Sequence, residues 1–595
     1  MTINKEIFVD LHEKYQKVLK LLLEDSKYDP ETEPYLSKYS AKQILIGMKA
    51  NIENILRSQT PGTQDHLKFT AMLGSVYLYL GTVAIDTEEL SLGEKHLEKC
   101  KEVICLSEDV PQMILIALNM YNQFGILWSK SDPEKSKFYL EVAEQLYKNF
   151  KNSGNIPVDI ADLFEPNLAT YHDNLAIINF EKLHTLTLYY LAQIFGVLKQ
   201  TFKSAVYCHI TLKRQLEMDD YEPIDWALNS ATLSQFFMEK CGFKQARHHL
   251  AASLYILDKY KADLFSGTDQ GEILDSKIEV FNHRSADVAR CWVKYGIFLL
   301  NKSKERLLAH TEDIDENCKI TSDLAKIELT DEAQVSIDDL QNLSFTSISV
   351  DKYENCISDQ FALTIADAKR IFVNAQEWIG KAQEYYTLDT HASDYIEIVL
   401  DFTQLYLNLI FFEDNYDSQA KLHKRRIDLL ETLSANINSQ YYMHYSRQMW
   451  FELGRTYSDL LDIKAEKLKE CNDRPKPQAL NKINSLVDKS IKYYKQFIDS
   501  FKLDITNLEK IPDENEKPFL QAYFHVAALF GRYITLDKQF QLKHNEQQYA
   551  HYKYIADYCE KHLKAQELIP MELGICKDMV TLLPIKLLRL KQTVS

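Results

Sequence analysis

The sequence predicts an all-α protein built from stacked pairs of antiparallel helices, and three observations support this. The 16 glycines and 14 prolines make up about 5% of the 595 residues, against roughly 12% in average proteins, which leaves few residues for the turns of a β-sheet protein. Apolar residues recur every three to four positions along most of the chain, as in amphipathic helices. A pattern of large and small residues is also repeated within residues 183–257.

That repeated pattern predicts how the helices pair. In each of its two copies, a small residue on one helix is followed twelve positions later by a small residue on the next, as in Ala192 with Ser204 and Ser234 with Ala246. Small residues at these positions let two helices cross closely, which is typical of tetratricopeptide repeats, although a 42-residue separation exceeds the usual repeat of roughly 34. Because one helix pair cannot bury its apolar face alone, further pairs are expected on both sides.

The N-terminal side supplies such pairs. Helical spacing predicts a first helix from Asn4 to Glu24 and, after a loop, a second that Ser40 caps and that ends near Ile55. Two hairpins follow, with small residues at Gly81 and Gly93 and at Gly125 and Ser136, and residues 151–166 are expected to form a loop. Residues 1–262 are therefore predicted to form an N-terminal solenoid.

The remaining chain is predicted to contain a connecting helix at residues 276–310, an acidic flexible linker at 311–360 and a C-terminal helical-repeat solenoid at 361–595. The linker is predicted from the many acidic residues between Thr311 and Asp339. Further helices are expected to begin near Thr364 and to cover residues 396–412, 419–433, 441–462, 463–470, 481–501, 519–536, 546–562 and 571–591. The predicted architecture is a tetratricopeptide-like right-handed α-solenoid in two halves joined by a helix and an acidic linker.

Composition and motifs exclude several functions. The 69 basic and 86 acidic residues give a net charge of −17, which disfavours direct binding to nucleic acid or anionic lipid. No apolar stretch approaches the ~20 residues of a membrane span, so no membrane insertion is expected. Scattered cysteines and a polar N-terminus favour a cytoplasmic protein. The sequence lacks the glycine loops, paired histidines and serine elbows of common enzymes, so we expect no catalysis, no cofactor and no metal.

Two groups of polar residues are candidates for partner binding. The basic run His423–Arg426 is interpreted as a solvated helix face, with an anion-binding patch as the alternative. In solenoids the first helix of each pair lines the concave face. This would place Tyr190 and Gln193 beside Thr232 and Gln235 on a surface able to bind a helix. An alternative is that Tyr190 belongs to the core. Large aromatic residues such as Trp226 and Trp292 are expected in the core.

Several strings resemble those of the KIF-binding proteins, also called kinesin family-binding proteins. The longest is residues 208–217 (CHITLKRQLE), and the others are residues 38–41, 85–90, 122–129, 189–193, 231–236, 289–292, 423–427, 558–562 and 579–584. The resemblance covers nearly the whole chain in order, except residues 58–64 and 310–360. It implies a non-catalytic solenoid that binds kinesin motor domains and keeps them off microtubules, and that acts in axon outgrowth and mitochondrial transport.

In that family the concave face of the N-terminal solenoid grips the motor on its microtubule-binding side. The resemblance assigns contact positions to Tyr190, Gln193, Lys213, Gln215, Thr232 and Gln235. It also implies a cytoplasmic, cytoskeleton-associated protein, with microtubule-associated proteins as further candidate partners. Self-association is not specified by the sequence. A second hypothesis is a tetratricopeptide adaptor that clamps peptide C-termini through Asn122, Lys213 and Arg214.

Overall fold

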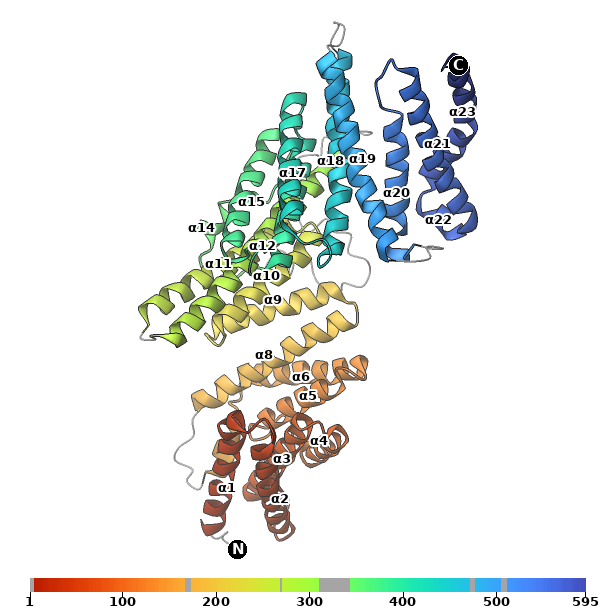
Figure 1. Ribbon diagram of the computed structural model, residues 1–595. Helices are drawn as coiled ribbons and strands as arrows, with labels where there is room; N and C mark the ends of the chain where they lie inside the picture. The colour runs from red at the N-terminus through yellow and green to blue at the C-terminus, as the bar shows by residue number, and fades with distance from the viewer. Residues whose placement is uncertain are drawn as a thin grey trace. The chain divides into compact units, whose positions relative to one another are not determined.

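The computed structural model describes residues 5–165, 173–267, 270–309, 343–470, 477–504 and 511–594. Every regular element in these ranges is a helix, which confirms the all-α class (Figure 1). The chain divides into two compact units, which are described separately. Unit 1 comprises Met1–Phe236 with Leu324–Ser349, and unit 2 comprises Phe237–Asp323 with Val350–Ser595.

Unit 1 is a succession of helices in which neighbours along the chain pack together, such as α3 with α4, α5 with α6 and α8 with α9. Its elements are α1 (Lys5–Leu23), η1 (Asp25–Tyr28), α2 (Leu36–Arg57), α3 (Gln64–Asp86), α4 (Leu90–Ile104), α5 (Ile114–Trp128), α6 (Pro133–Ser153), α7 (Ile160–Phe164), α8 (Asp173–Val197), α9 (Thr201–Glu217) and α10 (Pro223–Glu239) as far as Phe236.

Two local expectations for unit 1 were wrong. Ser40 does not cap α2, because the helix already begins at Leu36 and the Ser40 hydroxyl donates to the Leu36 oxygen at 3.0 Å within it. The segment 151–166 is not all loop, since α7 lies inside it with Asp159 as its cap. Helix α7 has only five residues, too few for the apolar spacing of a helix to be recognised in the sequence.

The small residues at the helix crossings lie where the sequence predicts. A Cβ atom added to Gly81 would lie 2.7 Å from Leu97, and one added to Gly93 would lie 3.3 Å from the Gly81 oxygen. In the next hairpin the Ser136 hydroxyl donates to the Gly125 oxygen at 2.6 Å. Close approach of α3 to α4 and of α5 to α6 therefore depends on residues without bulky side chains.

Helix α3 contradicts the expectation that no stretch is long and apolar enough to cross a membrane. Its 23 residues pass that test by length and composition, but 72% of the apolar window is buried inside the fold. Thirteen of its residues are buried, and it packs against α2, α4, α5 and α7. Its apolar character is that of a helix surrounded by other helices.

Unit 2 contains the remaining helices, which again pack mainly against their neighbours. They are α11 (Phe243–Ser266), α12 (Glu272–Ala309), α14 (Asp351–Glu354), α15 (Ile365–Tyr385), α16 (Ala392–Phe411), α17 (Tyr416–Asn436), α18 (Met443–Glu470), α19 (Pro477–Asp504), α20 (Asp513–Phe530), α21 (Lys538–Lys561), α22 (Leu563–Leu568) and α23 (Pro570–Val594). Helix α15 begins next to Thr364, near where the sequence predicts a helix, and Thr364 caps it in a capping box with Asp367.

Two predicted helix boundaries in unit 2 were wrong. Helix α18 is a single helix of 28 residues where two were expected, and α20 ends at Phe530, not at residue 536. Helices α18 and α19 form a long antiparallel pair (Figure 1). Its crossing repeats the arrangement of unit 1, since the Ser490 hydroxyl donates to the Gly454 oxygen at 2.6 Å.

The division between the units differs from the predicted boundaries. The predicted N-terminal solenoid ends at residue 262, whereas α11 belongs to unit 2. Helix α12, predicted as a connector at 276–310, packs against α11, α15 and α16. The predicted linker at 311–360 is corrected in part: residues 310–342 lie outside the described residues, but Phe345 is buried in unit 1 and Ile357 is buried in unit 2.

Buried residues confirm one prediction and correct another. Trp226 and Trp292 are each 1% exposed, as expected of core residues. The basic run is not a uniformly solvated face, because His423 and Arg426 are 3% and 1% exposed, while Lys424 and Arg425 face solvent. Arg426 donates to Glu452 at 3.2 Å, and burial lowers its pKa.

Candidate partner-binding surface

Three helices of unit 1 enclose a hollow of about 460 Å³, which we call the α8–α10 groove. It is open to solvent, and each of α8, α9 and α10 contributes residues to its wall. The lining residues are Tyr189, Ala192, Gln193, Gly196, Thr201, Ser204, Ala205, Cys208, Thr211, Leu212, Gln215, Asn229, Thr232, Leu233 and Phe236. Its size lies within the usual range of binding pockets.

The groove exists because the helices cross at small residues. The Ser204 hydroxyl donates to the Ala192 oxygen at 2.7 Å, which fixes α9 against α8. Gly196 next to this crossing has no side chain to fill the space, and a Cβ atom there would meet only the Ser204 hydroxyl, at 3.4 Å. The repeat pattern of the sequence therefore produces both the helix pair and the hollow beside it.

The structure brings together three of the six predicted contact residues. Gln193 and Thr232 are exposed and Gln215 is half-buried, and all three line the groove. Lys213 and Gln235 do not line it. Gln235 is exposed on α10, and Lys213 is half-buried on α9.

Tyr190, the sixth predicted residue, has an intermediate position. It is half-buried and packs against the apolar cluster formed by Leu140, Leu191, Ile194 and Phe195. Burial raises the pKa of its phenol, which is neutral at physiological pH. Neither of the two alternatives, a groove residue or a core residue, describes it fully.

Sequence reasoning missed other residues of the groove, although a signal for them was present. Tyr189 is 43% exposed and lies on the wall in place of Tyr190. On α10, Asn229 and Phe236 flank Thr232 at three and four residues, so the three share one helix face. On α8, Tyr189 and Gln193 are four residues apart and therefore lie on one helix face. This spacing, visible in the sequence, could have predicted that both residues line the groove.

The groove presents hydrogen-bonding groups without charge. Amide side chains of Gln193, Gln215 and Asn229 can both donate and accept. Burial raises the pKa of the Cys208 thiol, which keeps it protonated. Apolar surface comes from Leu233 and Phe236. A surface of this kind suits a polypeptide segment, which offers amide, hydroxyl and aliphatic groups.

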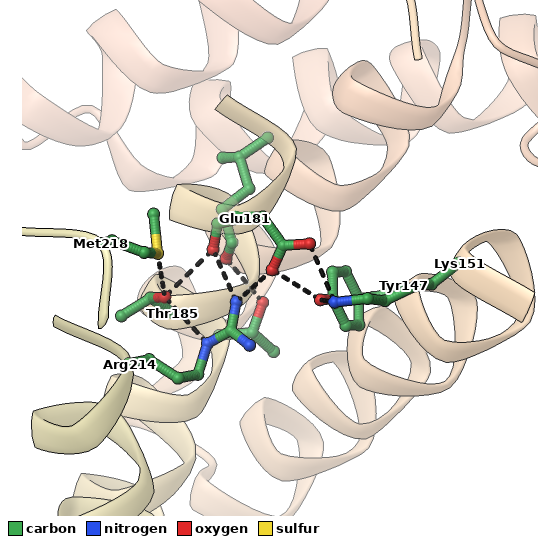
Figure 2. Close-up of polar contacts among 8 residues, drawn as sticks. Tyr147, Lys151, Glu181, Thr185, Arg214 and Met218 are labelled. Carbon is green, nitrogen blue, oxygen red and sulfur yellow. Dashed lines mark hydrogen bonds and ion pairs between the residues drawn. The ribbon is translucent and has the colours of Figure 1, made fainter. Parts of the chain in front are cut away.

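A polar network holds the start of α8 between α6 and α9 (Figure 2). The Glu181 carboxylate accepts hydrogen bonds from Arg214 at 2.6 Å, Tyr147 at 2.7 Å and Lys151 at 3.0 Å. Burial alone raises the pKa of Glu181, but bonds from Tyr147, Arg214 and Lys151 outweigh it and lower the pKa to about 2. Arg214 also donates to the Thr185 hydroxyl at 3.1 Å. The network fixes α8 and α9, two of the three helices that line the groove, to each other and to α6.

The residues of the hypothetical peptide-terminus clamp are not assembled for that task. Asn122 is 0% exposed. Its side chain donates to the Leu183 oxygen at 3.0 Å and accepts from Thr187 at 2.8 Å. Arg214 is engaged by Glu181. Of the three proposed clamp residues, Lys213 alone has no assigned partner among the described residues. Within the same residues, no group of three metal-ligating side chains occurs.

Comparison with known proteins places these features in a family. The family model described as KIF-1 binding protein C terminal matches residues 224–590. The KIF-binding protein of Gallus gallus is 36% identical over 594 residues, covering 97% of each chain. The chain belongs to the KIF-binding protein family. The KIF-binding proteins of Drosophila melanogaster and Homo sapiens are each 34% identical to this chain. Their alignments cover 99% or more of this chain and 99% of each relative.

A solved structure of the KIF-binding protein family supports the same conclusion. The cryo-EM map of KIFBP matches with a TM-score of 0.63 and 28% identity, covering 99% of this chain and 100% of that one. The family model begins at Ile224 in α10, so α8 and α9 lie outside it. The alignments with the relatives cover 97% or more of this chain.

Proposed function

We propose that this chain binds kinesin motor domains through the α8–α10 groove and thereby blocks their attachment to microtubules. One observation carries the proposal. Gln193, Gln215 and Thr232, which the family resemblance assigns to motor contact, come from three different helices and line one hollow. Relatives along the full chain length are named KIF-binding proteins, which supports a kinesin as the partner.

The chemistry of the groove supports binding of a helix. An amphipathic helix lays its apolar residues into such a groove and offers polar residues to the rim. Gln193 on α8, Gln215 on α9 and Thr232 on α10 all line the groove. These uncharged groups can fix the register of a bound helix, because each requires a partner at a defined position.

The charge of the chain supports the choice of motor surface. A kinesin presents basic residues to the acidic microtubule, and a chain with net charge −17 attracts the same surface. Occupying the track-facing side of the motor prevents attachment by competition, with no chemical step. The protein would act as a non-catalytic regulator of microtubule-based transport and axon outgrowth, located in the cytoplasm and associated with the cytoskeleton.

Microtubule co-sedimentation of a purified kinesin motor domain tests the proposal. The wild-type chain should lower the fraction of motor that pellets with microtubules. Gln193→Ala with Thr232→Ala should restore pelleting, whereas Gln448→Ala, an exposed glutamine on α18, should behave as wild type. Far-ultraviolet circular dichroism verifies that the variants fold. If wild-type chain leaves pelleting unchanged at low and at physiological salt, the proposed function is wrong.

A further inference from the structure

Helix α23, the last helix of unit 2, carries apolar residues on two opposite faces (Figure 1). It packs mainly against α21, and its inner face holds the buried residues Leu573, Cys576 and Leu583. On the outer face, large apolar side chains have exposed fractions between 47% and 81%. These exposed residues are Met571, Ile575, Leu582, Ile585 and Leu588. The kinesin proposal uses none of them.

Four of the exposed residues form a line along the helix, which we call the α23 stripe. Successive residues of a helix are rotated by about 100°, so Met571, Ile575, Leu582 and Ile585 all lie within a sector of about 80°. Their successive separations of four, seven and three residues are those of the a and d positions of a heptad repeat. This is the pattern of a helix that packs along its length against another helix.

The position of the stripe makes it unusual. A stack of helices normally ends in a helix with a polar outer face, because no further helix covers that face. Among the described residues, none covers the stripe, since its four side chains are exposed. Aligned apolar side chains on an exposed face mark a surface for association.

Two charged residues occupy other positions of the same heptad pattern. Asp578 falls at a d position and Arg589 at an a position, and both are exposed. Neither side chain forms an ion pair within the described part of the chain. The stripe therefore has an acidic group toward the start of the helix and a basic group toward its end.

A second copy of α23 running in the opposite direction matches both the apolar and the charged residues. When Leu582 of each copy faces Ile585 of the other, the centre of the pair lies between positions 583 and 584. Asp578 and Arg589 are equally far from that centre, so each Asp578 faces the Arg589 of the other copy. A parallel pair would instead place like charges together, which is unfavourable. The charges thus select the antiparallel direction.

We propose that the α23 stripe is a dimerisation surface, through which two copies of this chain pair by antiparallel contact of their α23 helices. The interface has two-fold symmetry, so the contact between Asp578 and Arg589 occurs twice. Polar residues within such a seam fix its register at some cost in stability. One helix pair is smaller than a standard interface of about 1,600 Å², so we expect a dissociation constant of about 10 µM.

Sedimentation equilibrium of the full chain tests the dimer. Between about 1 and 100 µM, the average mass should rise from near 69.3 kDa toward twice that value. Leu582→Asp places a charge at the centre of the pair and should keep the chain monomeric. Val373→Asp on α15, where the valine is 52% exposed, is the control and should dimerise as wild type does. A constant monomer mass of wild type, or undiminished dimerisation of Leu582→Asp, would overturn the proposal.

Exchange of the two charges tests the register. Asp578→Arg puts a like charge opposite Arg589, and Arg589→Asp does the same opposite Asp578. Each change alters two symmetric contacts and should weaken dimerisation by about ten-fold. The variant with both changes should regain wild-type association, because opposite charges meet again. Both residues are exposed, and thermal denaturation verifies folding. If the double variant is as weak as the single ones, the antiparallel pairing is refuted.

An anionic membrane is the competing occupant, because exposed apolar residues beside Lys586 and Arg589 also suit a lipid surface. Flotation with vesicles of equal parts phosphatidylcholine and phosphatidylserine distinguishes the two. We expect the chain to stay with the buffer, because its net charge of −17 opposes binding to anionic lipid. Flotation of wild type but not of Leu582→Asp, together with a monomer mass in solution, would assign the stripe to a membrane and overturn the proposal.

Discussion

The Ser204 hydroxyl group donates a hydrogen bond of 2.7 Å to the main-chain oxygen of Ala192 and joins α9 to α8 beneath the groove. The same bond recurs between Ser136 and the oxygen of Gly125 at 2.6 Å. It recurs again in unit 2, between Ser490 and the oxygen of Gly454 at 2.6 Å. In each of these helix pairs, a serine hydroxyl on one helix donates to the main-chain oxygen of a glycine or alanine on the other. We call this contact a serine joint.

Two substitutions of Ser204 should separate the stability contributed by this hydrogen bond from the stability contributed by close packing of the two helices. Ser204→Ala removes the hydroxyl without adding bulk and should lower the free energy of unfolding by about 1 kcal/mol. Ser204→Val also adds bulk at the crossing and should cost about 1–3 kcal/mol more. Urea unfolding followed by circular dichroism measures both. Equal stability of the two variants would mean that the α8–α9 crossing accommodates the larger valine side chain and is not closely packed.

Gly125→Ala should destabilise unit 1 by about 1–3 kcal/mol, because the added Cβ atom would lie 2.5 Å from Leu140. Gly47 in α2 is the control, since a Cβ atom there meets nothing within 4 Å. Gly47→Ala should stabilise the protein by about 0.5–1 kcal/mol through better helix formation. Thermal denaturation of both variants checks the opposite signs, and a gain in both would contradict the close packing of α5 on α6.

His184 should make unit 1 sensitive to mild acid. Burial, and then the nearby charge of Arg214, lower its pKa from 6.5 to about 3. The unfolded state therefore binds more protons between these values, so stability is complete above about pH 6.5 and falls as the pH drops below it. The loss at pH 5 should be about 2 kcal/mol. Urea unfolding at a series of pH values measures it.

His184→Phe provides the control for this titration. The imidazole stacks on Tyr147 with ring centres 3.6 Å apart, and neither of its nitrogens has a partner among the described residues. A phenyl ring can take its place without losing a hydrogen bond. The variant should be less sensitive to pH between 5 and 7. Burial also lowers the pKa values of His96, His423, His525 and His544, so these histidines remain as sources of pH dependence. An unchanged pH profile would exclude His184 as the cause.

Arg426 and Glu452 should respond unequally to mutation. Arg426 is 1% exposed, and two of its guanidinium nitrogens have no partner among the described residues. Arg426→Met removes the buried charge and should change the free energy of unfolding by less than about 1 kcal/mol. Glu452→Ala leaves that charge unpaired and should cost about 3–5 kcal/mol. Urea unfolding distinguishes them, and a larger loss from Arg426→Met would contradict this account.

Tyr190→Ala should lower stability as well as partner binding, because the ring packs on the cluster of Leu140, Leu191, Ile194 and Phe195. The expected cost is about 1–3 kcal/mol for half-buried aromatic surface. Tyr189→Ala, which removes an exposed groove residue, should leave the melting temperature nearly unchanged. Differential scanning calorimetry of the two variants tests the distinction. Equal melting temperatures would show that the Tyr190 ring does not contribute to packing and acts as a surface residue.

The sequence predicted what depends on local spacing and missed what depends on distant contacts. Gly81 and Gly93 identify a crossing because both residues of the joint lie within one hairpin. Phe345 gave no such signal, since it packs against His209 and Trp226, more than a hundred residues away. Arg426 was expected in solvent because buried arginines are rare. Tyr190 was chosen over Tyr189 because adjacent helical residues differ in facing by about 100°, a rotation that composition does not specify.

The joint between Ser204 and Ala192 has an evolutionary consequence. It uses a main-chain oxygen of α8 and a hydroxyl of α9, while Gln193 on α8 and Thr232 on α10 are exposed to solvent. Substitutions at these outward positions leave the joint intact. New binding preferences can therefore arise on an unaltered framework, one side chain at a time, without a loss of folding.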